Sequence, residues 1–181
     1  MKKYILLIIV AGLKFFGCED KVEEKFVSEV PNSFTKKVLI EEFTGTWCGY
    51  CPDGAGRLED IITNNDGNVI GVSTHSGDAM EVEQTYFLET TYQNLGYPSG
   101  MVDRISFDGY VSLNRGYWDF IASNQLSNTA SCGLAIKSNV SGSNATVEVH
   151  AGFASSHSGE HRLSVYLIED EVTGTGTGFD Q

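Results

Sequence analysis

A chain of 181 residues is long enough for one good domain, or for one domain and part of another. Apolar residues make up 41% of it, so a core can form, and 24 acidic against 12 basic residues give a net charge of −12. A chain this acidic is repelled by phosphate backbones and anionic lipid surfaces, so we expect no nucleic-acid partner.

The first 18 residues, "MKKYILLIIVAGLKFFGC", have the layout of a secretory signal. Two lysines precede an apolar run from Tyr4 to Leu13, and Gly17 precedes Cys18. A basic start, a short apolar stretch and a small residue at the cleavage point are typical of export. The Gly-Cys pair resembles a bacterial lipobox, in which Cys18 would carry the lipid and become the mature N-terminus. The alternative is a buried N-terminal helix with a stray thiol.

Residues 19–36 are charged and weakly patterned, so we expect a tether there. Residues 37–129 alternate strands with helices in the order β-α-β-α-β-β-α, which predicts an α/β domain with a central sheet covered on both faces. The expected strands lie over 38–43, 68–76 and 100–104, and a hairpin partner of the third follows the turn Asp108–Gly109. The first expected helix begins near Pro52, and the second covers 82–95 and is stopped by Gly96. Leu58, Ile61 and Ile62 are expected on the inner side of the first helix, and Trp118, Ile121, Ala122 and Leu126 on the inner side of a third.

The composition changes after Asn128, where Ser, Asn, Gly and Thr rise and alternate residues become apolar. This pattern predicts three antiparallel strands within residues 130–181, over 132–140, 144–153 and 161–170. A complete β-sandwich needs about seven strands. We therefore expect this β-rich segment to be incomplete, or to pack on the first domain or on a partner.

Two cysteines stand three apart in "TGTWCGYCPDG", directly after Trp47 and before Pro52. The pattern puts Cys48 at the start of a helix, where unpaired amides and the helix dipole favour a thiolate, and Cys51 one turn inside. Cys51 could then attack a mixed disulfide on Cys48 and release a substrate.

Two other interpretations of the cysteine pair stay open. One is a static disulfide that staples the helix end. The other is a metal site, which needs four ligands. None of the residues that could complete such a site forms a second close pair. Those candidates are His75, Cys132, His150, His157 and His161.

The stretch "VLIEEFTGTWCGYCP" resembles the strand, loop and active-site helix of thioredoxin-like proteins, which share the pattern W-C-x-x-C. The resemblance implies a thioredoxin fold for residues 37–129. It implies that Glu42 is a buried acid that exchanges a proton with Cys51. It also implies that Tyr97-Pro98 forms a cis-proline loop whose backbone pairs with substrate.

The same resemblance supplies the remaining site residues. Gly49-Tyr50 is the middle dipeptide of a periplasmic disulfide isomerase. The implied substrate contacts are Trp47, Gly49, Tyr50 and Tyr97, and the implied catalytic residues are Cys48, Cys51, Glu42 and Pro98.

A broader resemblance covers nearly the whole chain. The lipobox-like start, "IEEFTGTWCGYCP", "THSGD", "GYPSGMVDR" and "LSVYLIED" are together similar to the twenty-eight-kilodalton outer-membrane-protein-related lipoproteins of Bacteroidota-type bacteria. That family implies a thioredoxin-like domain followed by an immunoglobulin-like β domain, anchored in the cell envelope. The acidic residues after Cys18 also resemble the surface-export signal of such lipoproteins.

These observations favour an envelope thiol–disulfide oxidoreductase that acts on cysteine-containing envelope proteins. It would be held to the outer membrane by lipid on Cys18 and would use no cofactor and no metal. The alternative is a non-enzymatic adhesive lipoprotein with a static disulfide. His75, with Asp78 nearby, either lines the redox cleft or is an edge histidine. Asp103 and Arg104 are interpreted as a structural ion pair, and Cys132 as a buried thiol or a link to another chain.

Overall fold

The structure, a computed structural model, describes residues 33–173. The signal segment, Cys18 and most of the tether lie outside this range. The elements within it are β1 Val38–Thr44, α1 Cys51–Asn64, β2 Val69–His75, α2 Gln84–Thr91, β3 Ser99–Val102, β4 Leu113–Asn114, the short 3-10 helix η1 Arg115–Tyr117, α3 Trp118–Leu126, β5 Cys132–Ser141 and β6 Asn144–Phe153.

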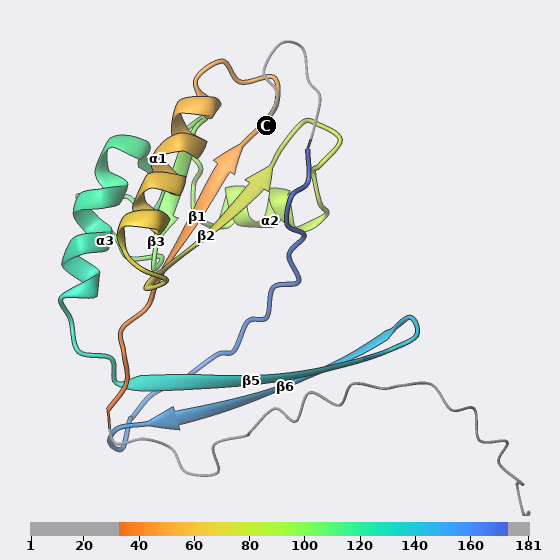
Figure 1. The fold of residues 1–181 in the computed structure, drawn as a ribbon. Coiled ribbons are helices and arrows are strands. Elements are labelled where there is room, and N and C mark those ends of the chain that lie inside the picture. The colour runs from red at the N-terminus through yellow and green to blue at the C-terminus, as the bar shows by residue number, and fades with distance from the viewer. Residues whose placement is uncertain (1–32, 174–181) are drawn as a thin grey trace, which may run out of the picture.

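The elements from β1 to α3 form a mixed α/β unit, in the order expected from the sequence (Figure 1). Its four-stranded sheet has the strand order β2-β1-β3-β4. β1 and β2 run parallel, whereas β3 runs antiparallel to both β1 and β4. In this register Glu42 of β1 lies between Ser73 of β2 and Gly100 of β3.

Each face of the sheet has its own core, as expected for a sheet covered on both sides. α1 and α3 cover one face, where Val38 and Ile40 of β1 meet Trp118 of α3. α2 covers part of the other face, where Phe43 of β1 packs with Leu88. Successive side chains of a strand point to opposite faces, so β1 contributes to both cores. Every second residue of β1 therefore lies on the side of α1, including Glu42.

α2 is shorter than the sequence pattern predicts, because it ends at Thr91 and leaves Tyr92 and Leu95 outside it. Gln93 adopts a left-handed conformation with φ of 53°, and the amide of Asn94 donates to the carbonyl of Glu89 at 2.8 Å. These are the marks of a Schellman motif. The helix is thus closed by its own C-terminal turn before the chain reaches Gly96.

The strand predicted over 100–104 also stops early, at Val102. Asp103 and Arg104 both have positive φ, which sends their side chains to different partners. Asp103 forms an ion pair with Lys36 at 2.5 Å, while Arg104 holds Glu41 through two nitrogens at 2.6 and 2.7 Å. The predicted Asp103–Arg104 pair is therefore wrong, since each residue is paired across the fold.

Only two of the three strands predicted after residue 130 form within the described chain. β5 and β6 pair along their full length in a separate two-stranded antiparallel sheet. Residues 161–170 are irregular. They run back toward the four-stranded sheet, where the hydroxyl of Tyr166 donates to Glu41 at 2.7 Å. A contact with the first sheet thus replaces the expected third strand.

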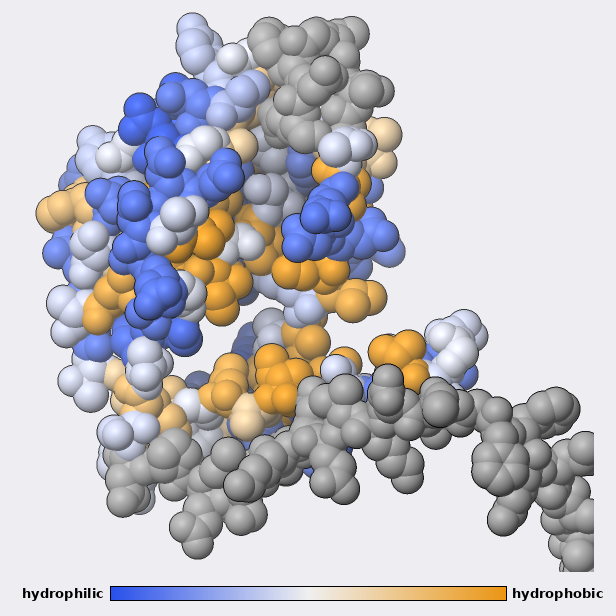
Figure 2. Space-filling model, viewed as in Figure 1, coloured by the Kyte–Doolittle hydropathy of each residue, from blue (hydrophilic) through white to orange (hydrophobic). Residues whose placement is uncertain are grey.

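The β5–β6 hairpin leaves one face apolar and exposed. The register places Leu134 opposite Ala151, Ile136 opposite Val149 and Val140 opposite Ala145. Figure 2 shows apolar residues gathered along the hairpin on the side that faces the α/β unit. The alternation expected from the sequence is present, but the described residues do not close a sandwich over this face.

Candidate functional site

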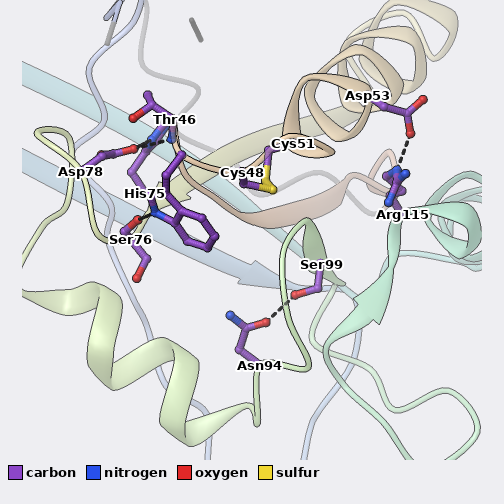
Figure 3. Close-up of a disulfide and its surroundings, with 11 residues drawn as sticks. Thr46, Cys48, Cys51, Asp53, His75, Ser76, Asp78, Asn94, Ser99 and Arg115 are labelled. Carbon is purple, nitrogen blue, oxygen red and sulfur yellow. Dashed lines mark hydrogen bonds and ion pairs between the residues drawn. A yellow bond between two sulfur atoms is a disulfide. The ribbon is translucent and has the colours of Figure 1, made fainter. Parts of the chain in front are cut away.

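The candidate site lies at the edge of the sheet where the parallel strands β1 and β2 end. Chains leaving such carboxyl edges form loops that can converge on one place, and binding sites of α/β sheets collect there. Here the β1–α1 loop, the β2–α2 loop and the segment before β3 come together around one disulfide (Figure 3).

Cys48 and Cys51 are joined by that disulfide, with 5.4 Å between their Cα atoms. α1 begins at Cys51. Cys48 therefore lies in the turn before the helix, whereas the sequence pattern predicted it at the start of the helix. Pro52 explains the difference, because its missing N–H leaves the carbonyl of Cys48 without a donor four residues on. The amide of Cys51 bonds that carbonyl instead, at 3.1 Å.

The two cysteines differ little in exposure. Cys51 is fully buried and Cys48 is 5% exposed. The amide of Cys48 donates to the carbonyl of Gly45 at 2.9 Å, which ties the turn back to the end of β1. Of the two cysteines, the one with any access to solvent is therefore Cys48, the residue that was expected to be the nucleophile.

Glu42 is a fully buried acid on the α1 side of β1. Its Oε2 accepts a hydrogen bond from the Ser73 hydroxyl at 3.0 Å, while Oε1 has no hydrogen-bond partner among the described residues. Burial raises the pKa of Glu42 to about 7, although the bond from Ser73 works in the opposite direction. A carboxyl with this pKa can both accept and return a proton near neutral pH.

Glu42 and Pro98 meet at the first turn of α1. A Cβ added to Gly54 would come within 2.5 Å of Glu42 Oε1 and within 2.8 Å of Pro98 Cβ. The Tyr97-Pro98 peptide bond is cis, as the resemblance implied. Gly54 allows this close approach because it has no side chain. Glu42 and Pro98, which were expected at one site, are 56 residues apart in the sequence and therefore meet at the start of α1 only through the fold.

The residues expected to contact substrate form the rim of the site. Trp47 is half-exposed, and its ring lies edge-on to Tyr97 with 5.0 Å between centroids. The indole Nε1 donates to the carbonyl of Ser76 at 2.7 Å. Gly49 and Tyr50 are exposed in the turn between the cysteines. Trp47 thus connects the loop before Cys48 with the loop before Pro98.

Asp53 and Arg115 extend this rim. Asp53, in the first turn of α1, forms ion pairs with Arg57 at 2.9 Å and with Arg115. These two hydrogen-bonding guanidiniums lower the pKa of Asp53. Arg115 also lies 5.8 Å from the centre of the Tyr50 ring. Tyr50, the exposed aromatic residue in the turn between the cysteines, therefore has the Arg115 guanidinium beside it, which Asp53 also holds.

His75 and Asp78 form a polar cluster on the other side of Trp47. Asp78 Oδ2 accepts from His75 Nδ1 and from the amide of Thr46, each at 2.8 Å. The pair was noticed from the sequence, but Thr46 was not. The sequence offered no signal for Thr46 or Ser73, because their contacts depend on β1 and β2 lying side by side in the sheet.

The residues proposed for a metal site do not gather. Within residues 33–173 there is no group of three or more His, Cys, Asp or Glu side chains that could hold a metal ion. His157 and His161 lie 5.7 Å apart by ring centroid and both pack near Phe153. Cys132 is a half-buried free thiol at the start of β5. These side chains are far along the chain from the disulfide.

The described residues include no helix long and apolar enough to cross a membrane. Residues 83–178 match the model of a family described as outer membrane protein Omp28, and this stretch is more than half of the chain. The chain belongs to the Omp28 family. That family indicates a location in the outer membrane or envelope. The matched stretch includes the cis-proline loop and the hairpin but begins after the cysteine pair.

Solved structures give a further comparison. HBP35 of Porphyromonas gingivalis is similar with a TM-score of 0.50 and 23% identity, over 60% of this chain and 38% of that one. At this identity the likeness shows the fold alone. A structural-genomics protein of Agrobacterium tumefaciens aligns with a TM-score of 0.42 and 18% identity, over 64% of this chain and 57% of that one, and carries no argument. This chain thus spans less than two thirds of either structure. No curated protein matches it.

Proposed function

We propose that this Omp28-family chain is a thiol–disulfide oxidoreductase of the cell envelope. Residues 37–129 would form a thioredoxin-like domain, and residues 130–181 would belong to an immunoglobulin-like β domain. The observation that carries the proposal is the meeting of Glu42 and Pro98 at Gly54, in the first turn of the helix that Cys51 begins. A static disulfide at this helix end needs no buried acid there.

The topology of the sheet supports a thioredoxin-like domain. The disulfide joins the end of β1 to the start of α1, in a sheet of order β2-β1-β3-β4 with one parallel and two antiparallel pairs. The cis peptide bond before Pro98 precedes β3, at the same end of the sheet. In the proposal the backbone of Tyr97, which is half-buried, pairs with an extended substrate segment.

The proposed chemistry begins with the reduced form of the pair. The Cys48 thiolate attacks a substrate disulfide, forms a mixed disulfide and releases one substrate thiolate. Cys51 then gives its proton to Glu42 and attacks the Cys48 sulfur, which releases the second substrate thiolate and closes the Cys48–Cys51 bond. Two electrons pass from the cysteine pair to the substrate, and the same steps in reverse oxidise a substrate dithiol.

The proposed partners are cysteine-containing proteins of the envelope. Lipid on Cys18 would anchor the chain, and the tether of residues 19–36 would give the domain reach. Cys18 lies outside the described residues, so this part of the proposal depends on the sequence alone. Metabolic labelling with a palmitate analogue would test it, since the Cys18→Ser variant should lose the label.

The redox proposal is tested by two cysteine variants. Cys48→Ser should abolish disulfide exchange in an insulin-reduction assay, because it removes the attacking thiolate. Cys51→Ser should instead accumulate mixed disulfides with partners, because the resolving thiol is missing. Partners trapped by Cys51→Ser and absent with the Cys48→Ser, Cys51→Ser double variant would support the mechanism. Recovery of no trapped partner and an inactive wild-type protein would contradict it.

The second candidate is a surface-binding protein with a static disulfide. The observations that favour it are the near-complete burial of both cysteines and the exposed apolar face of the β5–β6 hairpin. The reduction potential separates the two candidates. A structural disulfide is expected below about −300 mV, whereas a pair that exchanges with partners is expected between about −270 and −120 mV.

A further inference from the structure

Asp78 is the acceptor for three N–H groups, two from its own neighbourhood at the end of β2 and one from the β1–α1 loop. Its Oδ2 accepts from His75 Nδ1 and from the Thr46 amide, and its Oδ1 accepts from the Met80 amide at 2.9 Å. The Asp78 side chain is 6% exposed. Burial opposes its ionisation, but the bonds from His75, Thr46 and Met80 outweigh burial and hold the pKa of Asp78 below its usual range. A carboxylate is therefore fixed between the ends of β1 and β2.

The contact with the Thr46 amide joins the Asp78 carboxylate to the β1–α1 loop, two residues before Cys48. Thr46 is itself buried, and the residue after it is Trp47. Figure 3 shows Asp78 and His75 reaching the β1–α1 loop from one side, while Cys48 and Cys51 lie on the other side of the same loop. The hydroxyl of Thr85 donates to the carbonyl of His75 at 2.9 Å, which fixes the histidine backbone to the beginning of α2.

The Trp47 indole fits tightly beside this cluster. A Cβ on Gly45 would lie 2.6 Å from the indole Nε1, and a Cβ on Gly77 would lie 2.9 Å from it. Gly77 also has a φ of 71°, which a residue with a side chain adopts only with strain. The indole can occupy this slot only while the β2–α2 loop keeps its shape, and Asp78 belongs to that loop.

We propose that Asp78 and His75 are positioning residues that hold Thr46 and Trp47 in place directly before Cys48. Trp47 in turn touches Tyr97, directly before the cis-proline, so the cluster sets the relation between the cysteine loop and the substrate loop. The inference rests on the proposed exchange activity for its catalytic consequence. The hold on Trp47 can be measured without that activity.

The decisive variant is Asp78→Ala, which removes all three acceptor contacts at once. Acrylamide quenching of tryptophan fluorescence reports on Trp47, because the other tryptophan, Trp118, is fully buried. Quenching should rise in the folded variant as the indole leaves its slot. The kcat/KM for insulin reduction should fall about tenfold or more, since small misplacements of reacting groups are costly. The matched control is Asp60→Ala, an exposed carboxylate on α1, which should change neither quantity.

A second pair of variants isolates the histidine contact. His75→Leu removes the donor to Asp78, whereas His75→Asn puts an amide N–H close to where Nδ1 lies. We expect His75→Leu to raise acrylamide quenching and to lower kcat/KM, as Asp78→Ala does. We expect His75→Asn to keep both quantities close to their wild-type values. If Asp78→Ala does not fold, this pair decides the matter, and equal behaviour of the two histidine variants overturns the proposal.

The outcomes also separate this proposal from the function on which it rests. A wild-type protein without exchange activity would remove the oxidoreductase assignment, and quenching alone would then decide whether Asp78 holds Trp47. An active wild-type protein whose Asp78→Ala variant keeps kcat/KM within twofold would overturn the positioning role. So would quenching that stays at the wild-type value.

Discussion

At the scale of single residues, Glu42 shows how one buried oxygen can carry a functional argument. A carboxyl placed in the core without compensation is destabilising when charged, so a fold retains it only at a cost. Ser73 satisfies one oxygen, and the other faces Gly54 with no hydrogen-bond partner among the described residues. In the proposed function an acid in this state would take the proton of Cys51.

This burial predicts a pH dependence of stability that belongs to Glu42. Between its ordinary pKa of 4.5 and its folded value of about 7, the folded chain keeps a proton that the unfolded chain releases. Stability should therefore fall as the pH rises through this window, by up to about 3 kcal/mol from this group. The free energy of unfolding of Glu42→Gln should not show this decrease between pH 5 and pH 8, as measured by urea unfolding of the oxidised protein.

The control for this experiment is Glu59→Gln, an exposed acid on α1 that should leave the pH dependence as it is in the wild type. The conclusion about Glu42 would be wrong if Glu42→Gln and the wild type lost the same free energy of unfolding between the two pH values.

At the scale of elements, α1 contains two glycines in opposite surroundings. Gly54 lies against Glu42 and Pro98, whereas Gly56 has no atom within 4 Å of the place where a Cβ would stand. Both positions are helical, so alanine should gain about 1 kcal/mol from helix propensity at either one. The difference between the two variants therefore isolates the contact at the site.

We predict that Gly56→Ala raises the free energy of unfolding by about 1 kcal/mol. Gly54→Ala should lower it instead, by about 1 to 3 kcal/mol, because the new methyl group overlaps Glu42 and Pro98. Thermal or urea unfolding of the two proteins measures both effects. Equal stabilisation by both substitutions would mean that the cis-proline loop yields easily and is not held by α1.

The elements also show how far a local pattern can be trusted. Leu58, Ile61 and Trp118 were expected inside and are buried there, because their spacing is a property of a single helix. α1 begins at Cys51, which agrees with a helix expected to start near Pro52, whereas α2 ends earlier than expected. The end of α2 depends on a left-handed Gln93, which a sequence pattern does not mark.

At the scale of the whole molecule, Glu41 joins segments from both ends of the described chain. Arg104 pairs with this buried carboxylate through two nitrogens and also bonds Tyr166. Arg104 lies 4.8 Å from the centre of the Tyr92 ring as well. Burial and the Glu41 carboxylate raise the pKa of Tyr166 to about 12, so the hydroxyl stays a donor at any working pH. The chain after the hairpin is thus fastened to the four-stranded sheet at one point.

We predict that Tyr166→Phe loosens the segment around residues 161–168. Loss of a partly exposed hydrogen bond to a carboxylate should cost about 1 kcal/mol. Trypsin cleavage after Arg162 should then be about fivefold faster, as expected when local opening limits cleavage. Tyr86→Phe, on the exposed side of α2, serves as the control. Cleavage at the wild-type rate would show that Tyr166 does not fasten the segment.

The third strand expected over 161–170 fails for a reason that belongs to this scale. The alternation in "HRLSVYLIED" suits a strand, but a strand needs a neighbour with free backbone groups in register. In the described chain Tyr166 instead finds Glu41, 125 residues away. Contacts over such distances are invisible to a pattern read along ten residues.

The sequence by itself determined the order of the elements, the faces of the helices and the spacing of the cysteine pair. Helical and strand periodicity, prolines and glycines act over a few residues, so they can be read directly from neighbours along the chain. The tertiary structure alone decided that Gly54 lies between Glu42 and Pro98, that Asp78 holds Thr46, and that Arg104 pairs with Glu41. Each of these contacts joins residues on different elements, and its existence depends on how the strands are ordered and registered in the sheet.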